Sequence, residues 1–549
     1  MSEQRIREAY ARIDAVDRPE IWIALRDVED VVAEAATIDP SLPLAGVICA
    51  VKDNIDVAGL PTTAAAASYR YLPEQDATAV ARLRSAGAVV IGKTNLDQFA
   101  TGLVGTRSPF GAVRNAWDPT RISGGSSSGS AVAVALGLVD LALGTDTAGS
   151  GRVPAALNGI VGVKPTRGSI PTTGVVPACA SLDCVTTFAR DLRLARLAAE
   201  LMAGADGDDP RARTAGPPPP IAARPTIAVP RKEDLGILAE GWAQAFDRAI
   251  ARFAALGATI VEVDISPLLE AATLLYDGAF VAERYDAVGA HLEAHRDLIG
   301  ADLDPVVAAI ILAAKEPTAA EWARDTARLL TLGAAARENL GEYDALLTPT
   351  TTWHPTLAEV AAEPMSANAR MGRFTNFANL LDFASLAIPA GFVDGLPFGV
   401  MLSGPAFTDA TLADLAARFA NPELEIFVVG AHLSGQPLNP QLVLAGGTLV
   451  GAADTAPDYR MYALDTVPAK PGLVRVAEGG ASIAGEVWRL PAAGFGTFVA
   501  AIPEPMVIGQ VVLADGRSLS GFLVEPFALE GAREITEFGG WRVYRASLT

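Results

Sequence analysis

Ser150 stands on a loop of small residues that follows an apolar run. The run is 138–143, and Thr147, Ala148 and Gly149 come directly before the serine. Small residues allow a sharp turn and let a ligand approach the backbone N–H groups. Such N–H groups can hold a developing oxyanion beside a serine nucleophile, although most loops of this composition are simple turns. On its own, the loop predicts either an acyl-transfer site or an ordinary turn.

A lysine and a second serine-rich segment could activate that serine. Lys52 ends the apolar run 47–51, so we expect the base of its side chain to be buried. Burial lowers the pKa of a lysine, and a neutral lysine can act as a general base. The segment 123–130 reads Ser-Gly-Gly-Ser-Ser-Ser-Gly-Ser, in which Ser126 could pass the proton. Without this context, a lysine at a strand end is an ordinary solvated side chain.

The three segments together resemble the amidase signature family. Lys52, Ser126 and Ser150 follow one another with offsets of 74 and 24 residues, like the lysine, relay serine and nucleophile of that family. The resemblance implies an α/β fold with a mixed central sheet covered by helices. It also implies an oxyanion hole built from the N–H groups of Thr147, Ala148, Gly149 and Ser150. Ser128 and Ala148 stand where the family often has glycine, which leaves the choice of the relay among 126–128 to the alignment.

A rival interpretation uses the same serine-rich text. Residues 125–129 match G-x-S-x-G, which would make Ser127 a nucleophile that works with a histidine and an acid. The segment before it, 117–120, does not read as the strand that such a turn needs, so we favour Ser126 as a relay. The chain's histidines are His291, His295, His354 and His432. His291 and His295 could share a solvated helix face, and no motif for a metal or a cofactor appears.

Three further segments point to one branch of the family, the allophanate hydrolases. They are 95–106, 276–284 and 374–382. In that branch the residues that match Tyr276 and Arg284 hold the substrate carboxylate, and the one that matches Gly102 lies in the substrate channel. A guanidinium pairs with a carboxylate through two hydrogen bonds, which suits a small anionic substrate.

The C-terminal text resembles the second domain of the same enzymes. The segment 427–439 carries the resemblance, which implies a small β-rich domain similar in fold to gamma-glutamylcyclotransferases. It implies a role for His432 in decarboxylating the first product, whereas a turn-stabilising histidine is the alternative. Glu504 lies between two prolines and is no convincing counterpart of the cyclotransferase glutamate.

The resemblance implies hydrolysis of allophanate in urea or s-triazine nitrogen use, with urea carboxylase supplying the substrate in the first case. Two alternatives stay open. One is an amidase for another small amide, or the A subunit of an amidotransferase. The other is a catalytically inactive binding protein, against which the intact set of Lys52, Ser126 and Ser150 argues.

Composition limits the setting. The chain has 549 residues, of which 50% are hydrophobic and 19% charged, and a formal net charge of −20. This charge argues against nucleic acid or an anionic membrane as a partner. We expect no membrane span and no signal peptide. Three cysteines without a C-x-x-C pair favour a reducing, cytoplasmic location, and the alanine-rich helical text makes a homodimer plausible.

The text predicts two domains, at 1–420 and at 425–549, and the resemblance implies that the first is an amidase domain and the second a small β-rich domain. The expected helices are two segments within 1–36, then 78–86, 95–100, 130–139, 237–255 and 301–343. The expected strands are 45–50, 89–92, 226–229, 426–430, 448–451, 485–490, 507–513 and 519–524. A surface linker is expected at 204–220, a domain boundary near Asn421–Pro422, and a hairpin turn at 515–516.

Overall fold

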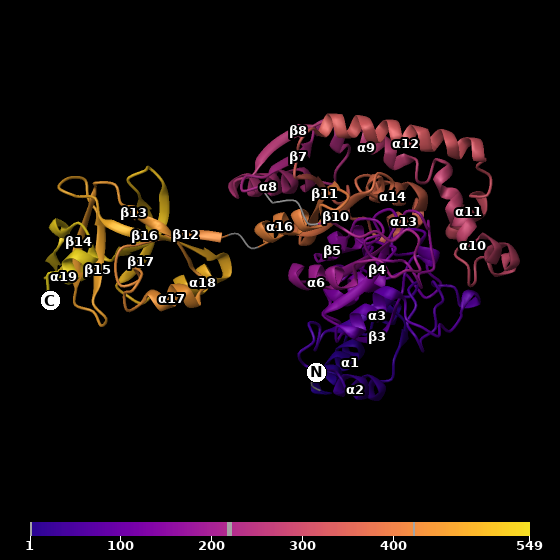
Figure 1. Ribbon diagram of the computed structural model, residues 1–549, viewed down its shortest axis with the longest axis horizontal. Coiled ribbons are helices and arrows are strands. Elements are labelled where there is room, and N and C mark those ends of the chain that lie inside the picture. Colours follow the sequence, from indigo (N-terminus) through magenta and orange to yellow (C-terminus); the bar gives the residue numbers. More distant parts are fainter. Residues whose placement is uncertain (1–2, 217–221, 421–422, 549) are drawn as a thin grey trace. The chain divides into compact units, whose positions relative to one another are not determined.

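The computed structural model describes residues 3–216, 222–420 and 423–548 (Figure 1). The chain divides into two compact units, Met1–Ala417 and Arg418–Thr549. The boundary expected near Asn421–Pro422 lies outside the described residues, as does the end of the expected linker, 217–220. In the part of the chain that the structure describes, none of the helices combines the length and apolar character that a membrane crossing needs.

The first unit is built on one mixed sheet of eleven strands, in the order β1-β3-β2-β4-β6-β5-β10-β11-β9-β7-β8. The strands are β1 Trp22–Leu25, β2 Ile48–Lys52, β3 Val89–Thr94, β4 Leu141–Asp146, β5 Val161–Lys164, β6 Cys184–Ala189, β7 Thr226–Pro230, β8 Thr259–Val263, β9 Ala345–Pro349, β10 Phe383–Val393 and β11 Leu396–Pro405. The strand β2 runs parallel to both β3 and β4, whereas β4 pairs antiparallel with β6. The expected mixed sheet is confirmed.

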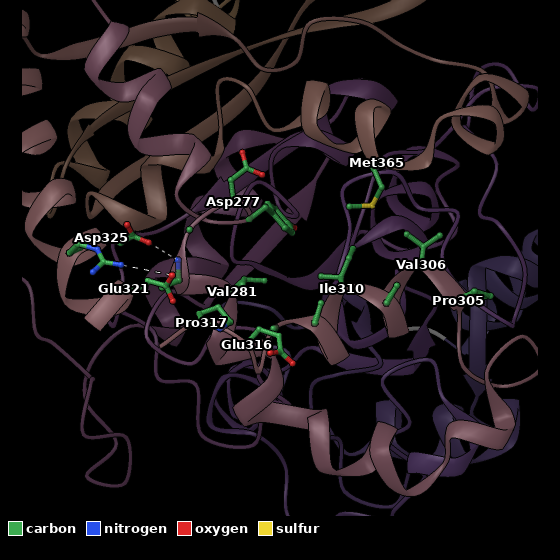
Figure 2. A pocket seen from close by; sticks show the side chains of 17 residues that line it. Asp277, Val281, Pro305, Val306, Ile310, Glu316, Pro317, Glu321, Asp325 and Met365 are labelled. Atoms are coloured by element: carbon green, nitrogen blue, oxygen red, sulfur yellow. Dashed lines mark hydrogen bonds and ion pairs between the residues drawn. The ribbon is translucent and has the colours of Figure 1, made fainter. Parts of the chain in front are cut away.

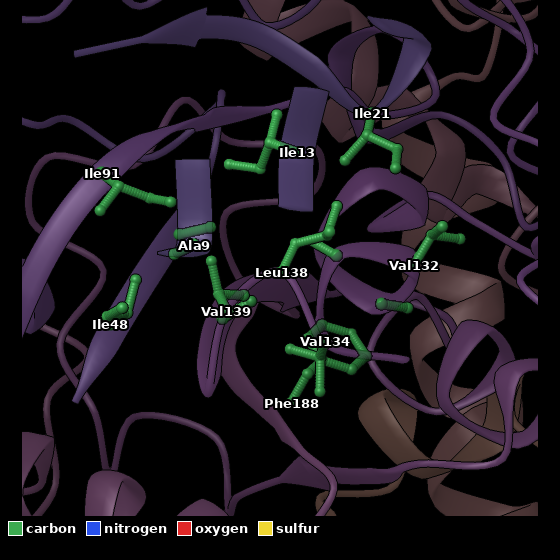
Figure 3. Close-up of a cluster of buried hydrophobic side chains, with 14 of the residues drawn as sticks. Ala9, Ile13, Ile21, Ile48, Ile91, Val132, Val134, Leu138, Val139 and Phe188 are labelled. Atoms are coloured by element: carbon green, nitrogen blue, oxygen red, sulfur yellow. The ribbon is translucent and has the colours of Figure 1, made fainter. Parts of the chain in front are cut away.

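Helices pack on this sheet and on one another (Figure 1). They are α1 Glu3–Val16, α2 Val28–Ala36, α3 Thr78–Ser85, α4 Ser128–Ala135, α5 Val153–Asn158, α6 Leu192–Met202, α7 Lys232–Leu235, α8 Trp242–Ala255, α9 Ser266–Thr273, α10 Ala282–Ala294, α11 Pro305–Ala313, α12 Ala319–Leu340, α13 Leu357–Ala362, α14 Pro364–Met371, α15 Asn376–Leu380 and α16 Asp409–Ala420. Figure 3 shows the apolar contact among α1, α4 and the sheet, where Ile13, Ile48 and Val132 are buried in one cluster. This packing holds β2 and β4, the strands that precede the site, in the core.

The predicted helix at 95–100 is wrong. Only a short 3₁₀ turn at Gln98–Ala100 forms, and Phe99 and Ala100 have φ values of 51° and 53°. The Asn95 side chain donates to the carbonyls of Glu20 and Gly111, and the Asp97 carboxylate accepts hydrogen bonds from the loop that follows. Bonds to distant backbone thus replace the local helical ones.

The second unit holds a five-stranded sheet, in the order β13-β16-β12-β18-β17, and a three-stranded sheet, β15-β14-β19. Its strands are β12 Glu423–Val428, β13 Thr448–Asp454, β14 Tyr459–Leu464, β15 Lys470–Arg475, β16 Ala484–Pro491, β17 Met506–Val512, β18 Ser518–Val524 and β19 Arg533–Glu534. Its helices are α17 Asn439–Leu444, α18 Ala492–Ala500 and α19 Trp541–Ala546. The hairpin predicted at 515–516 joins β17 and β18, and Gly516 has the positive φ of 86° that such a turn requires.

Candidate active site

Lys52 lies at the end of β2 and is fully buried. Its Nζ is 2.7 Å from Ser126 Oγ and 2.8 Å from Thr145 Oγ1. Burial lowers the pKa of Lys52 from 10.5 to about 7, although nearby carboxylates oppose the change. A lysine with this pKa is substantially neutral near pH 7, so Lys52 can accept a proton from Ser126.

The loop after β4 carries Ser150, whose side chain is almost fully buried. The Asp146 carboxylate accepts hydrogen bonds from the N–H of Gly151 and from the Arg152 guanidinium, 2.8 Å away. Arg152 also donates to Asn379 Oδ1, and Asn379 donates to the Asp146 carbonyl. The loop that holds Ser150 is therefore fixed by a buried ion pair and a buried amide.

The backbone N–H groups of this loop are available to a ligand. Within the described ranges, the N–H groups of Thr147, Ala148, Gly149 and Ser150 donate to no protein acceptor. The Thr147 hydroxyl makes a short hydrogen bond to the Asp183 carboxylate, which orients the loop from the start of β6. Buried N–H groups without partners are costly, and a set of them suits a developing negative charge.

Ser150 and the predicted substrate residues are connected through the loop 100–102. Ser150 Oγ donates to the Gly102 carbonyl over 3.4 Å. Two residues earlier in that loop, the Ala100 carbonyl and the Thr101 hydroxyl accept hydrogen bonds from Arg284, over 3.5 and 2.9 Å. The structure thus places Arg284 beside the segment that contacts the serine.

Arg284 is a buried cation on which Asp183 and Glu283 act at longer range than an ion pair. Its guanidinium is 1% exposed, lies 3.3 Å from the Tyr276 hydroxyl and packs over the Tyr276 ring. No described carboxylate forms an ion pair with it, and its Nε has no hydrogen-bond partner in the described chain. An unpaired buried charge is unfavourable, so an anion at this position would relieve the cost.

Gly102 has a reason to be glycine that the sequence did not show. We expected an open backbone for a ligand, but a Cβ on Gly102 would lie 2.5 Å from Asp97 Oδ2. The space beside Gly102 is therefore filled by the Asp97 carboxylate. Its carbonyl, rather than its missing side chain, faces Ser150.

Ser127, the rival nucleophile, is engaged with backbone. Its hydroxyl donates to the Thr145 carbonyl over 3.1 Å and accepts from the Thr145 N–H. His354 Nε2 donates to the Ile122 carbonyl, not to a serine. His291 and His295 stack at 4.2 Å and are half-buried against neighbouring side chains, so the expected solvated face is wrong. A serine–histidine pair at Ser127 is therefore contradicted.

Two adjoining cavities meet at Tyr276. One, of about 970 Å³, is lined by residues of α11, of α12 and of the turn between them, by the segment 276–281 and by Met365 (Figure 2). The other, of about 760 Å³, contains Asn368 and Asn376 beside the same Tyr276. Asn368 Oδ1 accepts the Leu103 N–H, next to Gly102. The second cavity is therefore one hydrogen bond away from the segment that contacts the buried serine, while Gly102, Ser150 and Arg284 line neither cavity in the described chain.

His432 lies in a different cavity, inside the second unit. This cavity, of about 530 Å³, is lined by His432, Lys470, Phe498 and Phe522 among others. His432 stacks on Phe522 at 4.9 Å and donates from Nε2 to Gln441 Oε1 over 2.9 Å. Burial lowers the pKa of His432, so the ring is neutral near pH 7.

Glu486, a buried glutamate of the second unit, connects two elements of that unit. Glu486 accepts hydrogen bonds from Ser434 and Trp488 and forms an ion pair with Arg542 at 2.7 Å. Burial alone would raise the pKa of Glu486, but these partners hold it below its usual range. Glu486 is absent from the lining of the His432 cavity among the described residues, and it ties β16 to α19.

Sequence reasoning missed three polar residues of the site. Thr145 contacts Lys52, Asp183 holds Thr147, and Asp97 fills the space beside Gly102. Asp97 stands within the segment 95–106 that supported the resemblance, but nothing in its spacing indicated a contact with the serine segments.

Comparison with known proteins identifies the class. The amidase family model matches residues 4–413, which is most of the chain, and the chain belongs to the amidase family. The model of the allophanate hydrolase C-terminal domain matches residues 424–546. Both matches fall within the two units that the structure separates.

Particular relatives narrow this class. The chain is 44% identical to the urea amidolyase of Lachancea kluyveri over 92% of this chain and 30% of that protein. The structure of Kluyveromyces lactis allophanate hydrolase is 41% identical, with a TM-score of 0.72, and the match covers 100% of this chain and 97% of that one. The A subunit of the glutamyl-tRNA(Gln) amidotransferase from Thermus thermophilus is 36% identical over 76% of this chain and 93% of that protein. The chain spans about a third of the length of the urea amidolyases it matches.

Proposed function

We propose that this chain hydrolyses allophanate, a urea that carries a carboxylate. The observation that carries the proposal is the buried, unpaired Arg284 guanidinium beside the loop that contacts Ser150. A carboxylate between Arg284 and Tyr276 would fix the substrate and turn its carbamoyl end toward the serine. The similarity of the whole chain to an allophanate hydrolase structure supports this choice of substrate.

The contact of Lys52 with Ser126 and the resemblance to the family suggest the order of the steps, in which Ser150 turns from the Gly102 carbonyl to Ser126. Ser150 Oγ attacks the terminal carbamoyl carbon while its proton passes through Ser126 to neutral Lys52. The N–H groups of Thr147, Ala148, Gly149 and Ser150 hold the oxyanion of the tetrahedral intermediate. The C–N bond breaks, and the departing nitrogen takes the proton back and leaves as ammonia. Water then cleaves the acyl ester and releases N-carboxycarbamate.

We assign the next step to the second unit. N-carboxycarbamate loses carbon dioxide, and the remaining carbamate decomposes, so that two ammonia and two carbon dioxide result in total. The cavity beside His432 contains the cation Lys470, which suits a dianion. Neutral His432 could take up or supply the proton that moves when carbon dioxide leaves.

An amidotransferase of the glutamyl-tRNA(Gln) type is the second candidate. Its support is the 36% identity with the Thermus thermophilus protein, which covers 76% of this chain. The match of residues 424–546 to the allophanate hydrolase C-terminal domain favours the first candidate. An inactive binding protein is disfavoured by the 2.7 Å contact between Lys52 and Ser126.

The setting is also a proposal. Cys49, Cys179 and Cys184 are free and buried, which supports a cytoplasmic location. The exposed face of α12 repeats apolar residues, with Leu330 71% exposed, and supports a homodimer. Light scattering of the wild type and of Leu330→Glu tests that dimer. The similarity to urea amidolyases supports a link to urea carboxylase, which would supply allophanate.

The decisive experiment measures ammonia release from allophanate, urea, biuret and neutral aliphatic amides, with Ser150→Ala as the control. Fast turnover of allophanate and slow turnover of the neutral amides is the expected result. A preference for a neutral amide would keep the serine chemistry and remove the role of Tyr276 and Arg284. Activity that survives in Ser150→Ala would remove the nucleophile assignment.

A further inference from the structure

Asp97 is a fully buried carboxylate between the loop 102–107 and the segment of Ser126. Its Oδ2 accepts the N–H groups of Val104 and Gly105, over 3.2 and 3.0 Å, and its Oδ1 accepts that of Arg107 over 2.9 Å. Because three backbone N–H groups bond to the Asp97 carboxylate, the loop 102–107 curves around this carboxylate and is fixed there. The Gly102 carbonyl, which accepts from Ser150, belongs to this loop.

The same residue also contacts the segment of Ser126. The Asp97 N–H donates to the Ser126 carbonyl over 3.1 Å. A Cβ on either Gly102 or Gly125 would collide with the Asp97 carboxylate, so the side chain fills the gap between the two glycines. Gly125 directly precedes Ser126, and Gly102 contacts Ser150. One side chain thus sets the separation of two segments that are distant in sequence.

We propose that Asp97 is a positioning residue for amide hydrolysis, which holds the Gly102 loop and the Ser126 segment at the separation that lets Ser150 and Ser126 exchange a proton. This inference rests on the proposed serine mechanism. Asp97 does not touch the reacting atoms itself. It acts through backbone, so its loss should slow the attack of Ser150 and leave the Arg284 contacts with substrate in place.

The charge of Asp97 gives the proposal a second consequence. Lys52 faces the carboxylates of Asp97 on the loop after β3, Asp146 on β4 and Asp183 before β6, of which Asp97 raises the Lys52 pKa most. Asp146 is paired with Arg152. Burial raises the pKa of Asp97, and Arg107 and the three N–H groups oppose that change. Removing the charge should lower the Lys52 pKa further and move the acid limb of activity to lower pH.

The test compares Asp97→Asn and Asp97→Ser with the wild type. Asp234→Asn is the matched control, because Asp234 is a buried carboxylate that binds Arg231 and the Ile265 N–H away from the serines. Thermal unfolding gives the folded fraction. A fluorophosphonate, whose phosphorus bonds to the Ser150 oxygen as fluoride leaves, gives the rate of serine attack without allophanate. Allophanate then gives kcat and KM as functions of pH.

The expected result is a fall of roughly 100-fold in labelling rate and kcat for the Asp97 variants, with KM nearly unchanged. Their acid limb moves to lower pH, and Asp234→Asn behaves like the wild type in both assays. The inference is overturned if the Asp97 variants keep labelling rates and kcat within about twofold of the wild type per folded molecule, and if the acid limb of their pH profile does not move. A wild type that is neither labelled nor active overturns the proposed function instead.

Should neither Asp97 variant fold, Gly102→Ala gives the answer. It keeps the charge and pushes the carboxylate with a new methyl group. Slower labelling by a folded Gly102→Ala protein supports the inference, and wild-type labelling contradicts it.

Discussion

The serine site of the first unit and the histidine cavity of the second unit are built on opposite plans. Lys52 and Ser126 are 0% exposed and Ser150 is 2% exposed, and buried hydrogen bonds hold each of them. His432 lines a cavity of about 530 Å³, where a ring stack and one amide fix its orientation. Burial lowers the pKa of the titratable group in both places.

The serine site and the His432 cavity differ because the reactions proposed for them have different requirements. Attack on an amide needs a nucleophile, a base and oxyanion donors placed to a fraction of an ångström, which a rigid buried network supplies. Loss of carbon dioxide from an unstable dianion needs a cation and a nearby proton carrier. We propose that the cavity lined by His432 and Lys470 supplies both. Substitutions at the serine site of the first unit should therefore reduce activity strongly, and substitutions at His432 in the second unit should reduce it only weakly.

The largest effect is expected for Ser150→Ala, because it removes the nucleophile itself. We expect ammonia release from allophanate to fall by roughly a million-fold, with little change in thermal stability. Ser127→Ala serves as the control, because Ser127 bonds only to the Thr145 backbone at this site. Comparable losses in both variants would contradict the assignment of Ser150.

Lys52→Met should lower the kcat for allophanate hydrolysis and raise the thermal stability of the protein. Loss of the general base should cost roughly 10³-fold to 10⁴-fold in kcat. The folded pKa of Lys52, about 7, lies below the unfolded value of 10.5, so the unfolded chain binds more protons between these values and the wild type becomes less stable as pH falls through that window. Methionine removes this cost, so the melting temperature at pH 8 should rise. A lower melting temperature would show that the hydrogen bonds of Lys52 outweigh its burial.

Arg284→Ala should weaken substrate binding more than it slows the reaction. The variant loses a charge-assisted pair with the substrate carboxylate, so KM for allophanate should rise roughly 100-fold. Hydrolysis of a neutral amide by the same variant is the internal control and should change little. An unchanged KM for allophanate would remove the proposed contact.

The next largest effect is expected for the change of wild-type activity with pH. With Lys52 as the base, log(kcat/KM) should rise with unit slope as pH increases to about 7 and then level off. An ordinary lysine stays charged to about pH 10, so a solvated lysine base would give an alkaline optimum instead. Initial rates of allophanate hydrolysis between about pH 6 and 9 measure this rising part of the pH profile. A limb centred above about pH 9 would mean that burial does not lower the pKa of Lys52.

His432→Ala should have the smallest effect on the first ammonia. Because the serine site is complete without it, the initial burst of ammonia should match that of the wild type. The second ammonia and the carbon dioxide should appear several-fold more slowly, as a delay between the two products. His432→Phe, which keeps the stack on Phe522, separates loss of the proton carrier from loss of packing. If neither variant shows the delay, His432 is a structural residue.

The sequence by itself predicted an α/β class, the helices α1 to α4, the strands β2, β3 and β7 and most of the five-stranded sheet of the second unit, and the resemblance supplied the mixed sheet and the pairing of Lys52 with Ser126. It could do so because apolar periodicity determines buried strands and helices, and because the motifs place Lys52 and Ser150 directly after buried strands. The hairpin at 515–516 was likewise determined by local backbone preference.

Only the tertiary structure decided the rest. The segment 95–100 forms a short 3₁₀ turn instead of the expected helix, because the hydrogen bonds of Asn95 and Asp97 to backbone outside the segment outweigh weak local propensity. A side chain at position 102 would collide with the Asp97 carboxylate, and the place of Gly102 in the substrate channel stays a prediction. The lowered pKa of Lys52 follows from complete burial, which is a property of packing around it. Contacts and burial of this kind join residues far apart in sequence, and one chain's spacing does not encode them.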